Sequence, residues 1–111
     1  MDPDVVVEVL SNDAKVTRII FEPSFQGLCL GGPYIGKVLI EYRPAATLIE
    51  FMTFETWLQG ESLKGTHTGE EMCRIIFDKM TELVGMVDLR VTLGGMTIAH
   101  GPATQQISRG F

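Results

Sequence analysis

The sequence predicts an α+β domain in which an antiparallel sheet carries two helices on one face. The predicted elements follow the order strand, strand, helix, helix, strand, strand. Strands joined by short turns pair antiparallel, and two successive helices can cover one face of such a sheet. Residues 1–111 are expected to form a single four-stranded domain of this kind, because 111 residues is close to the common domain size.

The second predicted helix is the strongest local signal. Thr68 and Glu71 have the spacing of a capping box, in which each side chain accepts a hydrogen bond from the other residue's backbone N–H. Gly85 stands where a glycine commonly ends a helix. Between these two ends, apolar residues recur at helical spacing and predict one buried face: Met72, Ile75, Ile76, Met80 and Leu83.

The first half of the chain predicts a bent β-hairpin. Residues 15–21 carry the β-branched side chains typical of a strand, which continues to Cys29. A turn at residues 31–34 leads into the returning strand, residues 37–42. Pro44 ends that strand, because proline cannot donate a hydrogen bond to a sheet ladder.

Shorter patterns predict the segments around this hairpin. Residues 5–10 predict a short strand or an arm, and residues 45–50 a short extended or turn segment. An apolar stripe with helical spacing then predicts the first helix, whose members are Phe51, Phe54, Trp57 and Leu58. Gly60 is its expected end.

The last part of the chain predicts two more strands. Residues 87–93 alternate apolar and polar side chains, as a strand buried on one face does. Gly94 and Gly95 predict a turn. Residues 96–99 are expected to begin a final strand that leads into a loose tail.

Composition and charge argue against several classes of protein. No apolar run approaches the roughly 18–20 residues needed to span a membrane, and the acidic start is unlike a secretory signal, so the protein is expected in the cytoplasm. The formal net charge of −5 has the wrong sign for gripping nucleic acid by bulk electrostatics, although a local basic patch in an oligomer stays open. The 2 cysteines do not predict a disulfide framework.

Cys29 is the central candidate for chemistry. It stands at a strand end before a Gly-Gly-Pro turn, where it is either a nucleophile or a small buried hydrophobe. His67 lies in a polar loop, and it is a candidate proton donor or a candidate base for the thiol. Tyr34, in the turn after Cys29, is the other candidate proton donor. Cys73 lies on or beside the apolar helix face and is expected in the core.

No metal site and no nucleotide-binding motif is predicted. Cys29, His67 and Cys73 could supply three ligands, but neither Cys-x-x-Cys nor His-x-x-x-His spacing occurs. Phosphate loops, serine triads and dinucleotide fingerprints are also absent from the sequence. No role is assigned to His100.

The order of elements, together with four short stretches, resembles the tunnelling fold and within it the QueF family. That family comprises the NADPH-dependent 7-cyano-7-deazaguanine reductases and the QueF-like amidinotransferases of archaeosine synthesis. The resemblance covers residues 16–97, and the stretches that carry it are Phe21-Glu22-Pro23-Ser24-Phe25-Gln26-Gly27-Leu28-Cys29, Ile40-Glu41-Tyr42-Arg43-Pro44, Glu50 with Thr53 and Trp57, and Glu70-Glu71.

Three departures from the family pattern bear on the reaction. A shorter loop after Cys29 places Tyr34 nearest the position of the family's proton-donating aspartate. Gly69 replaces the histidine before the anchoring glutamate, and His67 lies two residues upstream. Residues 50–58 contain no lysine, unlike the nicotinamide-binding motif of the reductases, so no NADPH and no other cofactor is expected.

The resemblance implies a nitrile-directed amidinotransferase. Cys29 would add to the nitrile of 7-cyano-7-deazaguanine, free or within tRNA or another nucleic acid, and ammonia would convert the thioimidate to an amidine. Glu70 would bind the base, Glu50 would reach it from the adjacent subunit, and His67 or Tyr34 would supply the proton. A homo-oligomeric barrel is implied. The alternatives are an NADPH-dependent nitrile reductase and a non-catalytic binder of a guanine- or pterin-like base.

Overall fold

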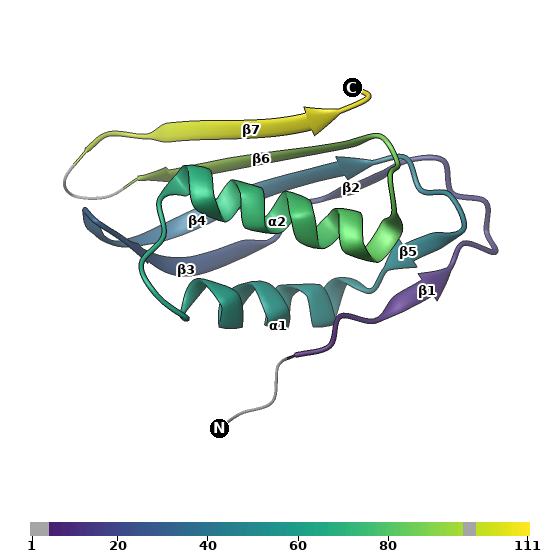
Figure 1. The fold of residues 1–111 in the computed structure, drawn as a ribbon, viewed down its shortest axis with the longest axis horizontal. Helices are drawn as coiled ribbons and strands as arrows, with labels where there is room; N and C mark the ends of the chain where they lie inside the picture. The colour runs from purple at the N-terminus through teal and green to yellow at the C-terminus, as the bar shows by residue number, and fades with distance from the viewer. Residues whose placement is uncertain (1–4, 97–99) are drawn as a thin grey trace.

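Two helices cover one face of an antiparallel sheet in the computed structural model, which describes residues 5–96 and 100–111 (Figure 1). The α+β prediction is therefore confirmed. In chain order the elements are β1 (Val9–Ser11), β2 (Ile19–Phe21), β3 (Ser24–Cys29), β4 (Gly32–Tyr42), β5 (Thr47–Ile49), α1 (Phe51–Ser62), α2 (Gly69–Val84), β6 (Leu89–Met96) and β7 (Ala103–Arg109). No helix among the described residues is both long and apolar enough to cross a membrane.

Within the described residues, the main sheet has five strands rather than the predicted four, and they fill four positions. Its order is β2–β4–β6–β7, and β3 also pairs with β4. Strand β2 pairs with the last residues of β4, whereas β3 pairs with the first ones, so β2 and β3 act as one bent strand. Pro23 lies at the bend, where its carbonyl accepts a hydrogen bond of 3.0 Å from the backbone N–H of Val38. The bent hairpin is thus present.

The hairpin turn between β3 and β4 fixes the position of Cys29. Cys29 pairs directly with Gly32, which leaves Leu30 and Gly31 as the loop. Gly32 has a φ of 106°, a conformation that favours glycine because it has no Cβ atom. The turn therefore places the Cys29 side chain at the extreme end of the sheet.

Helix α2 begins and ends as its sequence predicts. The Thr68 hydroxyl accepts from the Glu71 N–H at 3.1 Å, and the Glu71 carboxylate accepts from the Thr68 N–H at 3.1 Å. Gly85, with a φ of 83°, ends the helix and donates to Thr81 O at 2.9 Å. The buried face of α2 joins a core shared with β4 and β6; its central members are Met72, Ile76, Met80, Ile40, Val91 and Leu93.

Helix α1 is longer than predicted. It passes through Gly60 and ends at Ser62, so the expected stop at Gly60 is wrong. The last turn is held against β3 instead: Ser62 Oγ donates to Gln26 O at 2.7 Å, while the Gln59 carboxamide accepts from Gln26 N and donates to Gln26 O, both at 3.0 Å. These bonds stabilise the helical turn around Gly60 and attach α1 to the strand that carries Cys29.

The end of the chain differs from the prediction. Gly94 and Gly95 lie inside β6 rather than in a turn, and the expected loose tail is the paired strand β7. The predicted start of a strand at residues 97–99 lies outside the described residues. Strand β7 carries polar side chains on both faces, so the hydrophobic alternation by which strands are predicted is missing.

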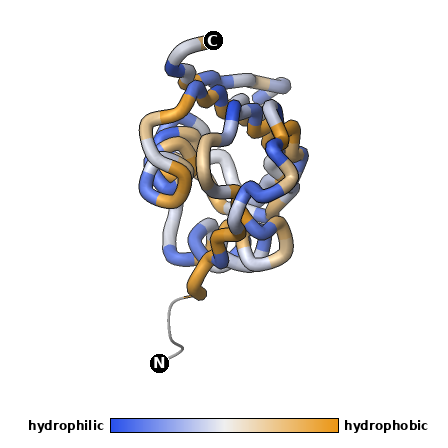
Figure 2. Tube along the Cα trace, turned by 90° about the vertical axis from the view of Figure 1, so that its right-hand side faces the viewer, coloured by the Kyte–Doolittle hydropathy of each residue, from blue (hydrophilic) through white to orange (hydrophobic). Residues whose placement is uncertain are grey.

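The two short flanking segments pair with each other. Strand β1 lies antiparallel to β5, with Val9 opposite Ile49. The predicted arm at residues 5–10 and the predicted extended segment at residues 45–50 therefore form a second, two-stranded sheet. The described chain begins with a hydrophobic segment, residues 5–7, which leads into this sheet (Figure 2).

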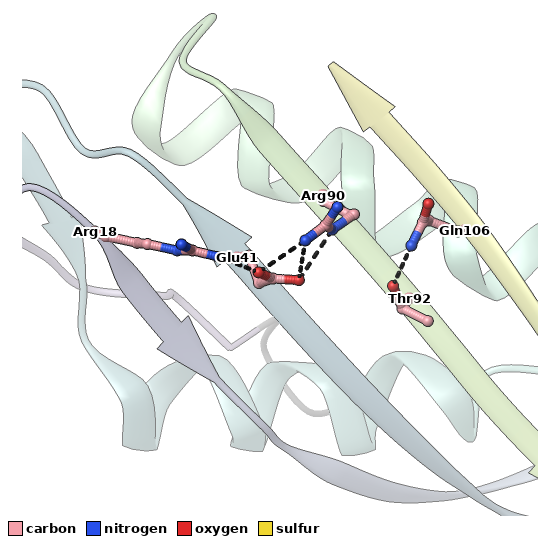
Figure 3. A network of polar contacts seen from close by, with 5 residues as sticks. All are labelled: Arg18, Glu41, Arg90, Thr92 and Gln106. Atoms are coloured by element: carbon pink, nitrogen blue, oxygen red, sulfur yellow. Dashed lines mark hydrogen bonds and ion pairs between the residues drawn. The ribbon is translucent and has the colours of Figure 1, made fainter. Parts of the chain in front are cut away.

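The face of the main sheet opposite the helices carries a buried ion-pair network (Figure 3). Glu41 is only 5% exposed and accepts hydrogen bonds from Arg18 at 2.7 Å and from Arg90 at 2.9 and 3.0 Å. Its neighbours in β4, Ile40 and Tyr42, point the other way into the core. The hydrogen bond from Arg18, and secondly those from Arg90, lower the pKa of Glu41 against the opposing effect of burial.

Candidate active site

A cavity of about 250 Å³ lies at the end of the sheet where the β3–β4 turn meets the start of α2. The turn contributes Cys29 and Tyr34 to its lining, and the start of α2 contributes Glu70. The connection from β6 to β7 contributes His100, and β7 itself contributes Gln105. Polar and nucleophilic groups from three separate parts of the chain therefore surround one small space.

Cys29 is only partly buried and can reach a ligand in this cavity. Its Sγ lies 3.5 Å from the carbonyl oxygen of Gly32, to which the thiol can donate. The turn holds the side chain at the end of the strand, with no apolar residue pairing against it. The arrangement is that of an accessible thiol rather than of a core cysteine.

Cys73 shows the contrasting case. It is 1% exposed, and its Sγ lies 3.5 Å from Val91 O and 3.9 Å from Gln105 O. Burial raises the pKa of the Cys73 thiol, so the thiol stays neutral and unreactive at physiological pH. The predicted core position of Cys73 is confirmed, which leaves Cys29 as the available nucleophile among the 2 cysteines of the sequence.

Tyr34 is fixed beside Cys29 by glycines on the strands that flank it. A Cβ atom on Gly27 would lie 2.8 Å from the Tyr34 ring, and one on Gly95 would lie 3.2 Å from it. The ring also packs edge-on against Phe25 at a centroid distance of 5.7 Å. Burial and, secondly, the charge of an ionised Cys29 raise the pKa of Tyr34. The phenol is therefore protonated at neutral pH and can donate.

Glu70 lines the cavity and, unlike its neighbour Glu71, takes no part in the helix cap. The Glu71 carboxylate is taken up by the capping box, and its hydrogen bonds to the Thr68 backbone and hydroxyl lower the pKa of Glu71. Glu70 forms no hydrogen bond or ion pair with any described residue, and it lines the cavity in the first turn of α2. A carboxylate there is favoured by the helix dipole and remains able to accept two hydrogen bonds from a ligand.

Two of the predicted site residues lie elsewhere in the single chain. Glu50 caps α1: its carboxylate accepts from Met52 N at 2.7 Å and from Thr53 N at 2.8 Å, and these bonds lower its pKa. It is not among the residues that line the Cys29 cavity. His67 also stands outside that lining, although its backbone N–H donates to Leu28 O at 3.0 Å.

The His67 ring is oriented inward rather than toward solvent. Its Nε2 atom is buried and has no hydrogen-bond partner among the described residues. Leu28 directly precedes Cys29, so the backbone bond keeps the His67 loop beside the strand that carries the thiol. The structure thus brings together Cys29, Tyr34 and Glu70 around the cavity, whereas His67 is next to the strand that carries Cys29 but outside the lining.

His100 and Gln105 line the cavity but were not predicted from the sequence. Both belong to the part of the chain that was interpreted as a loose tail, so nothing indicated that it returns to Cys29. The Nδ1 atom of His100 donates to Gly101 O at 2.6 Å. Only the pairing of β7 with β6 would have indicated that these residues lie at the cavity. That pairing depends on contacts between residues distant in the chain, which local sequence patterns do not reveal.

No metal centre is found in the part of the chain that the structure describes. None of its His, Cys, Asp and Glu side chains form a group of three or more that could hold an ion. Cys29 and Cys73, considered together with His67 as possible ligands, have separate environments: one lines the cavity and the other lies in the core.

Comparison with known proteins bears on the fold. No family model matches the chain, and no curated protein matches it. Among solved structures, the crystal structure of the archaeosine synthase QueF-Like in the apo form is similar, with a TM-score of 0.75 and 14% sequence identity. The match covers 86% of this chain and 96% of that one. In its fold the chain is thus similar to a QueF-like archaeosine synthase, which confirms at that level the resemblance predicted from its residues.

Proposed function

We propose that the protein is a QueF-like amidinotransferase, which converts the nitrile of a 7-cyano-7-deazaguanine base to an amidine. The observation that carries the proposal is the meeting of Cys29, Tyr34 and Glu70 around one cavity. These residues supply a nucleophile, a proton donor and an acceptor for a guanine-like edge. The similarity to an archaeosine synthase supports the same proposal, at the level of the fold.

The cavity suits a single planar base. Its volume of about 250 Å³ lies just below the roughly 300–1,000 Å³ of common small-molecule pockets. A bicyclic base would fill it, and a ribose or a nucleic acid strand would remain outside. Glu70 would accept hydrogen bonds from the N1–H and the 2-amino group, a pattern that a carboxylate recognises with two parallel bonds.

The chemistry begins at Cys29. Its thiolate attacks the nitrile carbon, a C–S bond forms, and the triple bond becomes a C=N double bond. The nitrogen takes a proton from the Tyr34 phenol. The proton that Cys29 released on ionisation then returns to Tyr34 by way of solvent and restores the phenol. Ammonia then adds to the thioimidate carbon, the C–S bond breaks, and Cys29 leaves as a thiolate. The product is a protonated amidine, which keeps the third hydrogen of ammonia and balances the charge of the thiolate; no oxidant, reductant or cofactor is consumed.

Association of several copies would complete the site. Among the strands that the structure describes, β7 leaves one edge of the main sheet unpaired, and the bent β2–β3 strand leaves the other. The sheet face away from the helices also exposes apolar side chains, among them Ile20 at 59% and Ile35 at 61%. In a homo-oligomeric barrel built on these edges, Glu50 of an adjacent copy would approach the base. His67 would be a second candidate for the proton transfers, as a donor to the nitrile nitrogen or as a base that takes the thiol proton.

Mass spectrometry of the intact protein tests the proposal. After incubation with 7-cyano-7-deazaguanine, the protein should gain the full mass of the base, because addition to a nitrile expels no leaving group. The variant Cys29→Ala should gain nothing, whereas Cys73→Ala should gain the same mass as the wild type. Ammonia should then release the amidine.

Other outcomes would favour the alternatives. Binding of the base without an adduct would indicate a non-catalytic binder, and it would overturn the mechanism. An adduct that is consumed only together with NADPH oxidation would indicate a nitrile reductase. An adduct on Cys73 would exclude Cys29 as the nucleophile.

A further inference from the structure

The Gln105 side chain occupies space that exists only because residue 69 is glycine. A Cβ atom on Gly69 would lie 2.5 Å from Oε1, 2.8 Å from Cδ and 2.9 Å from Nε2 of Gln105. Such distances are far below ordinary van der Waals contact. The carboxamide of β7 therefore lies directly on the first residue of α2, beside Glu70 at the cavity.

The Gln105 carboxamide is not used by the fold. The backbone carbonyl of Gln105 lies 3.9 Å from the buried Cys73 thiol, a contact that ties β7 to α2. The side chain itself makes no hydrogen bond with any described residue, and it lines the cavity. The next residue shows the contrast: Gln106 points to the other face of the sheet and donates to Thr92 at 3.0 Å (Figure 3).

Glu70 and Gln105 have complementary hydrogen-bonding abilities. An ionised carboxylate only accepts, whereas a carboxamide can also donate through its NH₂ group. A guanine-like base presents two donors, N1–H and the 2-amino group, followed on the same edge by an acceptor, the oxygen on C6. The pair formed by Glu70 and Gln105 matches this sequence of donors and acceptor, and an amino group on C6 would not match it.

We infer that Gln105 is a specificity-determining residue, which donates a hydrogen bond to the oxygen on C6 while Glu70 accepts from the other two positions. The inference rests on the proposed function, because it assumes a base bound on Glu70. It adds a preference for an oxygen acceptor on C6, a position that Glu70 would not contact. Gly69 is required for this role because any side chain there would displace the carboxamide.

Equilibrium binding to two bases tests this role. The Cys29→Ala variant prevents covalent trapping, so affinities for 7-cyano-7-deazaguanine and for its 6-thio counterpart can be compared by calorimetry. The 6-thio base keeps the N1–H and the 2-amino group that Glu70 would bind, and only the acceptor on C6 differs. The first base should bind about tenfold or more tightly, because sulfur is a weak acceptor and leaves the Gln105 donor nearly unpaired. Adding Gln105→Leu should remove most of this preference, whereas adding Gln106→Leu should leave it unchanged.

The Gly69→Ala variant tests the same role without altering the glutamine. The helix should tolerate alanine, and the displaced group is the far end of a flexible side chain, so the protein should stay folded. The preference should fall as in Gln105→Leu, and the combination of both changes should lower it no further. A preference that survives both variants would overturn the role of Gln105 and leave the proposed function standing. If the Cys29→Ala protein binds neither base, the proposed function fails as well.

Discussion

The Tyr34 ring lies against the bare backbone of Gly27, which is its direct partner across the β3–β4 ladder. A Cβ atom on Gly27 would come within 2.8 Å of the ring carbons and 2.9 Å of the hydroxyl oxygen. The phenol beside Cys29 is thus positioned by the absence of a side chain on the neighbouring strand. This relationship can be tested without altering any residue assigned to the chemistry.

Gly27→Ala should slow formation of the Cys29 adduct by about tenfold or more, because a small displacement of a proton donor is costly. The rate is measured by intact mass at timed intervals. Gly60→Ala is the matched control, since a Cβ there meets nothing within 4 Å and alanine suits a helix interior. An unchanged rate in Gly27→Ala would show that the position of the phenol does not matter.

Tyr34→Phe should lower the rate of adduct formation by about 10²-fold, the lower range for loss of a general acid. The ring and its packing on Phe25 remain, so the fold should be unaffected. Alkylation of Cys29 by iodoacetamide needs no proton donor and should keep its wild-type rate. If adduct formation keeps pace with the wild type, the proton comes from another group, and the His67→Gln variant becomes the decisive comparison.

Glu70→Gln should weaken binding of the base by about 10²-fold, because two charge-assisted hydrogen bonds are each replaced by weaker or mismatched ones. Calorimetry on the Cys29→Ala background gives the affinity. Glu71→Gln is the control, since glutamine also serves in a capping box and Glu71 is not among the residues lining the cavity. Equal affinities in the two variants would show that Glu70 does not bind the base and is only an acidic residue at the start of the helix.

Glu41→Gln should destabilise the protein by about 1–2 kcal/mol at pH 7, since Arg18 and Arg90 lose their charged acceptor while remaining partly solvated. The lowered pKa of Glu41 means that its contribution is fully present above its ordinary value of 4.5 and is lost as the pH falls through the folded-state pKa below that. Urea unfolding at several pH values should therefore show the wild type and variant converging in acid. A constant difference between them would contradict this.

The proposed barrel requires a stable homo-oligomer. Sedimentation at micromolar concentration should give a mass well above the 12.3 kDa of one chain. Placing a charge on the open sheet face, as in Ile35→Asp, should favour the monomer, whereas the exposed loop variant Lys15→Asp should not. A folded wild-type monomer would remove the shared site and with it the role of Glu50.

Short-range patterns were sufficient for much of the fold. The ends of α2 follow from Thr68, Glu71 and Gly85, because caps depend on residues within one turn of the helix. The strand that ends at Cys29 and the core position of Cys73 follow from equally local signals. The resemblance to a known family also rested on short stretches, and the similarity of the fold confirms it at that level.

Only the tertiary structure decided where the polar strand β7 lies and which side chains occupy the space that Gly69 and Gly95 leave open. Gly95 is predicted to lie in a turn, but it belongs to β6, where it pairs with Gly36 and leaves space for the Tyr34 ring. Gln105 meets Gly69 through the pairing of β7 with β6, which no periodicity within β7 reveals. Close approaches of this kind depend on residues far apart in the chain, so they emerge only when the sheet and helices pack together.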